Sequence, residues 1–254
     1  MISLSEAQLT AWLSPVLWPF LRTLAVFTAA PVFSSRAFPV RVKVALALLV
    51  AVCAQASLAN QPVVSFTGAL ALETLVQQVG VGLAIGFAVR VLFASMGLVG
   101  EIIGLQMGLN FATFFDPSSN SQASAVSAFF NHMASLLFIV FNGHLLVLMA
   151  VVKSFNAFPV GMGLLEVLNT VRLFDLGADL FSSALWLALP MTALLMLVNL
   201  GLGIISRVAP QINIYAVGFP LTLIVGLLGI TATLPMLEQP VTGLFEHALE
   251  LFAK

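Results

Sequence analysis

Charged side chains are scarce in this 254-residue chain: Asp, Glu, Lys and Arg make up 7% of it, whereas soluble domains carry about a quarter. The nine basic and ten acidic residues leave a net charge of -1 without a basic tract, which excludes nucleic acid as an expected partner. The single cysteine, Cys53, excludes an internal disulfide, and its apolar neighbours predict a buried, inert thiol. Catalytic motifs such as His-Glu-x-x-His, Gly-x-Ser-x-Gly and a phosphate-binding glycine loop are missing, so we expect no enzymatic activity, cofactor or metal.

Apolar residues dominate instead. They make up 61% of the chain, and the mean hydropathy is +1.12. Such a chain cannot cover a water-facing surface, and a membrane-spanning helix needs about 20 mostly apolar residues. The sequence therefore predicts an all-α, multi-pass helical membrane protein. Its apolar stretches lie at 12–30, 42–59, 68–93, 94–115, 124–152, 180–205 and 211–235.

Basic residues in short loops predict the direction of the spans. Arg36, Arg41 and Lys43 share one tight turn, which should be cytoplasmic, so the N-terminus should lie outside. Arg90 and Arg207 should also lie on the cytoplasmic side. An even number of crossings must then separate these two residues, although three apolar stretches lie between them.

The segment 94–115 is the weakest of these three stretches. It carries Glu101, Gln106 and Asn110 and is interrupted by four glycines. We expect it to re-enter or to lie in a protein-lined cavity, where irregular backbone is tolerated. The expected architecture is therefore about six long helices, crossing six times, with a re-entrant segment and a C-terminal helical hairpin.

Gly100, Gly104 and Gly108 recur every four residues in this segment. Their spacing indicates a smooth helix face that another backbone can approach closely. The apolar residues Met107, Leu109, Phe111, Phe114 and Phe115 follow, and "DPSSNSQ" then supplies turn formers. An apolar loop on a polar turn could be a hydrophobic gate that closes a pore by excluding water. It could equally be a loop that fills space between helices.

The stretch from Leu202 to Leu221 predicts the tip of the hairpin. Pro210 should end the incoming helix and free carbonyls that Arg207, Gln211 and Asn213 can satisfy. Only fifteen residues run from Pro220 to Leu234, about 22 Å of helix against a hydrocarbon layer of about 30 Å. The residues before Pro220 should therefore also lie at membrane or interface depth.

Other polar residues have ordinary explanations. His132 and His144 are expected about 120° apart on one helix, too far around it for a metal pair, and their neighbours Asn131 and Asn142 favour hydrogen bonds between helices. Glu73, Gln77 and Gln78 are expected to be solvated at the outer interface. Arg22 should pair with a carboxylate or carbonyl across a subunit contact. The segment 153–179 predicts an amphipathic surface helix through Leu164, Leu165, Leu168, Val171 and Phe174.

The stretches "RVAPQINIYAVGFPL" and "GLNFATFFDPSSNSQ", with the basic turn and the "SEAQL" start, make the chain similar to the FliR family of flagellar type III export-gate subunits. This resemblance implies a non-enzymatic channel subunit that assembles with FliP and FliQ homologues, near FlhB and FlhA homologues, and passes unfolded flagellar proteins. The expected location is the flagellar basal body in the bacterial inner membrane, in contact with lipid. The resemblance also implies a single gate subunit (1–254), with a FliP-like part at 1–178 that includes the plug segment 94–123, and a FliQ-like hairpin part at 179–254.

The resemblance assigns the Phe-rich loop as the pore plug. The expected plug residues are Met107, Gly108, Leu109, Asn110, Phe111, Ala112, Thr113, Phe114, Phe115, Asp116 and Pro117. The expected cytoplasmic hairpin tip consists of Arg207, Pro210, Gln211, Asn213, Gly218 and Pro220. Two alternatives are the corresponding subunit of a virulence injectisome and, from another class, a secondary transporter of small solutes. A transporter would need convergent polar groups at the midplane, whereas the polar residues here gather at turns.

Overall fold

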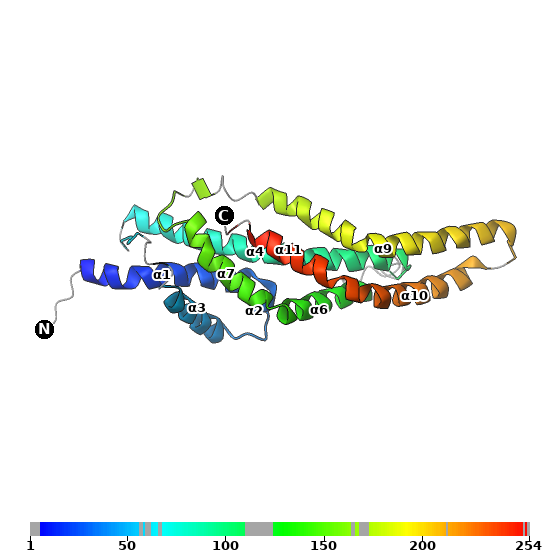
Figure 1. Ribbon diagram of the computed structural model, residues 1–254, viewed down its shortest axis with the longest axis horizontal. Helices are drawn as coiled ribbons and strands as arrows, with labels where there is room; N and C mark the ends of the chain where they lie inside the picture. Colours follow the sequence, from blue (N-terminus) through cyan, green and yellow to red (C-terminus); the bar gives the residue numbers. More distant parts are fainter. Residues whose placement is uncertain are drawn as a thin grey trace, which may run out of the picture. The chain divides into compact units, whose positions relative to one another are not determined.

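The computed structural model describes residues 6–55, 58, 62–65, 68–109, 124–163, 166–167, 173–211, 213–250 and 252 (Figure 1). Over these residues the regular structure is helical throughout, which confirms the all-α prediction. The chain divides into two compact units. Unit 1 comprises residues 1–92, 139–177 and 245–254, and unit 2 comprises 93–138 and 178–244. One boundary between the units, 177/178, lies beside the expected division at 178/179, but residues 93–138 group with the hairpin.

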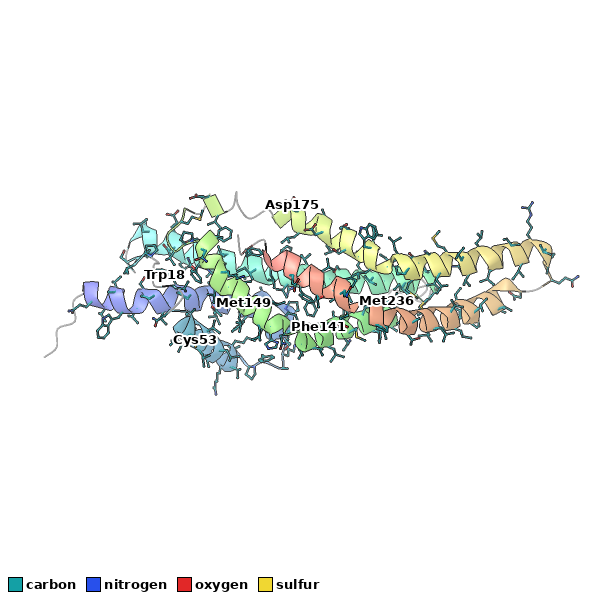
Figure 2. The ribbon with its side chains drawn as sticks, viewed as in Figure 1. Trp18, Cys53, Phe141, Met149, Asp175 and Met236 are labelled. Carbon is teal, nitrogen blue, oxygen red and sulfur yellow. The ribbon has the colours of Figure 1, made fainter. Side chains whose placement is uncertain are left out.

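Unit 1 is built around the N-terminal helices. It contains α1 (Glu6–Ala29), α2 (Pro31–Ser34), α3 (Val40–Ala54), most of α4 (Ala69–Gln106), and α7 (Gly143–Ala157). Figure 1 shows α3 beside α1, and α3 buries Ala47, Ala51 and Ala54, which recur at helical spacing on one face. Cys53, labelled in Figure 2, lies off this face and is exposed, so the prediction of a buried thiol was wrong.

Two glycines of α4 let it cross α1 at short range. A Cβ atom on Gly82 would overlap the carbonyl oxygen of Arg22 and lie 2.7 Å from the Ala25 Cβ. A Cβ atom on Gly86 would overlap the Cβ of Ala29. The close approach of these two helices therefore requires glycine at both positions.

Unit 2 holds the C-terminal hairpin. Its elements are the end of α4, most of α6 (Ala125–Val140), most of α9 (Leu173–Val208), α10 (Ile214–Thr233), the 3-10 turn η2 (Leu234–Met236) and the start of α11 (Glu238–Glu250). Figure 1 shows α9 and α10 running side by side in opposite directions. The buried face of α10 is lined by small residues, Gly218, Thr222, Gly226 and Gly229. A Cβ atom on Gly229 would lie 2.7 Å from the sulfur of Met191 on α9, so glycine again permits the contact.

The helix boundaries change the expected number of crossings. Four helices are long and apolar enough to span a membrane: Gln8–Ala29, Ala69–Gln106, Asp175–Val208 and Ala216–Met236. The number becomes five if α6 and α7 together form one broken span. Among the described residues the chain therefore has fewer helices of spanning length than the six expected crossings. The 15 residues of α3 are too few to cross the hydrocarbon layer.

The largest difference concerns α4. Residues 69–106 form one continuous helix of 38 residues, so residues 94–106 are not a separate re-entrant segment. Gly97 and Gly100 of this region lie inside the helix and pack against Asn131 and Ser127 of α6. Arg90 consequently lies inside a helix and not in a loop, which removes it as an anchor for the topology. The predicted span 124–152 is broken instead at Phe141–Asn142, where Asn142 adopts a left-handed conformation with φ 55°.

Two helices, α7 and α9, extend into the polar connection 153–179 from its two ends. α7 continues to Ala157 and α9 begins at Leu173. Leu164, Leu165, Leu168 and Val171, on which the amphipathic helix was predicted, lie outside the described residues, and Phe174 falls in the first turn of α9. That prediction stays a prediction.

Candidate functional site

The helix α4 stops at the start of the expected plug because of one glycine. Gly108 has φ 78°, a conformation that glycine adopts without steric cost. Its N–H donates to the Leu105 carbonyl at 3.0 Å, and the N–H of Leu109 donates to the Gly104 carbonyl at 3.0 Å. This pair of bonds is the Schellman pattern, which satisfies carbonyls at the end of a helix. Gly108 therefore terminates the helix and does not continue the packing face of Gly100.

The last residues of α4 are fastened to the hairpin within unit 2. Met107 is fully buried and fills the space left by Gly226 of α10, where an added Cβ would lie 2.6 Å from its side chain. The hydroxyl of Thr222 donates to the Met107 carbonyl at 3.1 Å. Asn199 of α9 donates to the Gln106 carbonyl at a longer 3.4 Å. Both helices of the hairpin therefore contact the residues at which the expected plug begins.

The other end of the segment is fixed to α4 at an earlier turn. Ser124 caps α6, because its hydroxyl accepts from the Ser127 amide at 3.1 Å, and its own amide donates to a carboxylate oxygen of Glu101 at 3.1 Å. The Ser127 hydroxyl donates to the Gly97 carbonyl at 2.9 Å. A Cβ atom on Gly100 would overlap the Ser127 backbone, so close packing at this position requires glycine. The acidic Glu101 also lies favourably at the N-terminus of a helix.

The expected plug residues divide into two groups. Met107, Gly108 and Leu109 are described and form the turn at the end of α4. Asn110, Phe111, Ala112, Thr113, Phe114, Phe115, Asp116 and Pro117 lie outside the described residues. Of the glycines expected to pack closely, Gly100 does so against α6, and Gly104 is buried in α4.

The expected tip residues lie in and beside the turn between α9 and α10. α9 ends at Val208, just before Pro210, and both Arg207 and Gln211 are exposed. The side chain of Asn213 accepts from the Ala216 amide at 3.4 Å, so it caps the start of α10 and not the carbonyls at the end of α9.

The second helix of the hairpin begins before Pro220, within the predicted apolar stretch 211–235. Pro220 lies inside α10, which starts at Ile214, and Gly218 is buried on its packing face. The candidate span Ala216–Met236 has 21 residues, enough to cross the hydrocarbon layer. The residues before Pro220 therefore add the length that the fifteen residues from Pro220 to Leu234 lack for crossing the hydrocarbon layer.

A buried polar cluster in unit 1 was missed from the sequence. Arg22, Gln77 and Gln78 are all fully buried, although the glutamines were expected to be solvated. Arg22 donates from Nε to Gln78 Oε1 at 2.8 Å, from Nη1 to the Ser154 hydroxyl at 2.9 Å, and from Nη2 to the Phe158 carbonyl at 2.7 Å. Its guanidinium lies 3.6 Å from the centroid of the Phe155 ring.

The cluster continues through the glutamines to the chain after α7. Gln78 donates to Gln77 Oε1 at 3.1 Å, and Gln77 donates to the Pro159 carbonyl at 2.8 Å and accepts from the Gly161 amide at 3.1 Å. The predicted carbonyl partner of Arg22 therefore exists, but it belongs to the same chain and not to a neighbouring subunit. The cluster joins α1, α4 and the end of α7.

The histidines do not form a site. His132 lies on α6 and His144 on α7, so they do not share a helix as predicted. His132 Nδ1 contacts the Ala128 carbonyl one turn earlier at 2.6 Å. Within the described part of the chain, no group of three or more His, Cys, Asp or Glu residues could hold a metal.

Comparison with known proteins shows the family of this helical chain. The profile of the family "Bacterial export proteins, family 1" matches residues 13–248. The flagellar biosynthetic protein FliR of Escherichia coli (strain K12) is 40% identical over 255 residues, covering 100% of this chain and 97% of the relative. FliR of Pectobacterium carotovorum subsp. carotovorum is 38% identical with the same coverage, and FliR of Bacillus subtilis (strain 168) is 26% identical over 91% of this chain and 90% of the relative. The chain therefore belongs to bacterial export protein family 1, as a FliR-type membrane component of the flagellar export apparatus.

Proposed function

We propose that this protein is a non-enzymatic subunit of the flagellar export gate in the bacterial inner membrane. In this proposal it assembles with FliP and FliQ homologues, and with FlhB and FlhA homologues nearby, into a channel for unfolded flagellar proteins. The 94–123 region is its plug segment, the 1–178 part is FliP-like, and the 179–254 part is the FliQ-like hairpin. Membership of the family and the flagellar names of the relatives support this assignment over a virulence injectisome.

The observation that carries the plug assignment is the anchoring of both ends of the Phe-rich segment within unit 2. Met107 is held by Thr222 and Gly226, and Ser124 is held by Glu101. Glu101 lies only five residues, about 7.5 Å of helix, before the end of α4 at Gln106, so a short length of chain joins the two anchors. The fourteen residues 110–123 between the anchors could reach about 50 Å if extended. The segment is therefore much longer than the connection requires, as a pore plug between fixed ends would need to be.

Apolar composition gives this segment its proposed action. Phe111, Phe114 and Phe115 offer large apolar side chains, and an apolar constriction blocks ions by excluding water. Unfolded export substrates could displace these side chains, since the contacts are not directional.

Deletion of residues 110–114 tests the plug. The variant should assemble with the FliP and FliQ homologues but make cells leaky to small ions, measured as membrane depolarisation or potassium loss. The matched control replaces the same five residues with Gly and Ser, which keeps the chain length but removes the apolar side chains; it should leak as well. Intact complexes of both variants without added ion leakage would contradict the plug role. Failure of the unaltered chain to co-purify with its partners would contradict the gate assignment itself.

A further inference from the structure

Beyond its first two turns, where Leu70, Leu72, Glu73 and Leu75 are also exposed, the part of α4 from residue 76 to residue 90 exposes a single narrow stripe. Every residue from 76 to 90 is buried or half-buried except five, Val76, Gly80, Leu83, Phe87 and Arg90. These five, called here the α4 stripe, are separated by four, three, four and three residues. At 100° per residue they fall within an arc of about 80°. The remaining circumference of the helix is already covered by this chain.

The spacing of the stripe is that of a helix-packing seam. Alternating steps of four and three residues keep one face of a helix against a single neighbouring helix, with side chains inserted as knobs. Leu83 and Phe87 are each 45% exposed and could serve as knobs. Gly80 has no atom within 4 Å of the place where a Cβ would be, so it leaves a notch for a large side chain of a partner.

Arg90 at the end of the stripe limits what can cover it. No hydrogen bond or ion pair joins its side chain to another described residue, and the side chain is exposed one turn after Phe87. Lipid tails would cover Leu83 and Phe87 well, but a charged side chain in the hydrocarbon layer costs about 2.5–3.5 kcal/mol or more. Water would suit Arg90 but would leave the apolar side chains of the stripe in contact with solvent.

A helix that is apolar along most of its face and carries one carboxylate would satisfy both parts of the stripe. We propose that the α4 stripe docks one helix of a neighbouring subunit of the export gate, with an Asp or Glu side chain of that helix opposite Arg90. This inference rests on the proposed function, because it requires the chain to assemble with other membrane subunits. The apolar contacts supply area, and the ion pair fixes the register of the two helices.

A second copy of this chain fits the stripe poorly. Two copies inserted in the same direction carry parallel α4 helices, because the direction of insertion is set by the sequence. Side-by-side packing through the stripe would then place Arg90 against its own counterpart, a pair of like charges. Stripe-to-stripe packing of two copies is therefore disfavoured, and we propose that the carboxylate comes from a different protein.

The test uses the full chain co-expressed with the FliP and FliQ homologues of its own bacterium and purified through a tag on this chain. A photo-crosslinking benzoylphenylalanine at Phe87 should join one helix of a partner, and the mapped site should lie within about one helical turn of an Asp or Glu. Arg90→Glu should lower the recovery of that partner by at least about tenfold, and Arg90→Lys should retain most of it. Lysine in place of the mapped partner acid should restore recovery with Arg90→Glu.

The matched control is Arg41→Glu, which reverses the charge of another exposed arginine outside the stripe. The same partner lysine should not raise the recovery of the partner with this variant. Crosslinks from Phe87 only to lipid or to a second copy would overturn the inference. So would full recovery with Arg90→Glu, or a loss that the partner lysine does not restore. If the unaltered chain retains no partner, the proposed gate function fails as well, so the two failures can be told apart.

Discussion

The buried cluster around Arg22 gives a sharp prediction about stability. Arg22 makes three hydrogen bonds at 2.7–2.9 Å, and none of the described carboxylates forms an ion pair with it. Its charge is compensated only by neutral oxygens and by the Phe155 ring. Removing an oxygen should therefore harm the fold more than removing the charge does. The two variants to compare are Gln78→Leu and Arg22→Met.

The expected loss of stability for each variant follows from the buried groups that it leaves unpaired. Gln78→Leu keeps a buried cation but removes its Nε acceptor. A buried charge that loses its partner entirely costs about 3–5 kcal/mol, and because Arg22 keeps two acceptors we expect a loss of about 2–3 kcal/mol or more. Arg22→Met leaves the Gln78 oxygen and the Phe158 carbonyl unpaired, at about 1–3 kcal/mol each, but it also removes the desolvation penalty of the charge, which is several kcal/mol, so its net loss should be smaller. The loss of the Arg22 hydrogen bond affects Ser154 least, because the Ser154 hydroxyl still donates to the Val151 carbonyl at 2.7 Å. Combining both substitutions removes the stranded cation, so the double variant should be more stable than Gln78→Leu alone.

The assay is unfolding of the detergent-solubilised chain in increasing dodecyl sulfate, followed by circular dichroism, with the unaltered chain and all variants compared at the same protein concentration. Gln78→Asn, which retains an amide, serves as the milder control and should fall between the unaltered chain and Gln78→Leu. The reasoning would be refuted if Arg22→Met were the most damaging single change. It would also fail if the double variant were less stable than Gln78→Leu.

Two further predictions concern glycines. Gly82→Ala should destabilise unit 1 by about 2 kcal/mol or more, since the new methyl group overlaps the Arg22 carbonyl. Gly203→Ala lies in open space on α9 and should stabilise the protein by up to about 1 kcal/mol. Thermal unfolding should therefore show a lower melting temperature for the first variant and a higher one for the second. Gly108→Ala should cost about 1–2 kcal/mol because of its φ of 78°, and Gly108→Asn should cost less; equal losses from alanine and asparagine would show that φ is not the cause.

Hydropathy identified the long helices because their apolar runs leave no alternative to helical structure in a membrane. The helix boundaries were harder to predict. Glycines at 97, 100 and 104 suggested that α4 was interrupted, but glycine between packed helices is a contact residue and not a break. The true end required φ 78° at Gly108, and no pattern distinguishes that glycine from the three before it. The break at Asn142 was missed for the same reason, since asparagine is common both in helices and in left-handed turns.

The polar cluster of unit 1 was missed because its members are distant in sequence. Gln77 and Gln78 look like interfacial residues beside Glu73, and only the packing of α1 on α4 brings Arg22 to them. One signal was available. An arginine inside an apolar span requires partners, and a neighbouring span with two adjacent glutamines was the richest source of them. The small-residue face of α10, Gly218 to Gly229, could also have been recognised from its regular spacing.

The anchors at the two ends of the Phe-rich segment limit how the proposed gate could open. Four hydrogen bonds hold them: Thr222 to Met107, Asn199 to Gln106, Ser124 to Glu101, and Ser127 to Gly97. At about 0.5–1.5 kcal/mol each, and with Met107 seated against Gly226, moving an anchor would break several contacts together. Movement between Gly108 and Ser124 breaks none of them. Opening by separation of the hairpin from α4 would therefore break these contacts together, and we expect substrate passage to leave the anchor contacts intact.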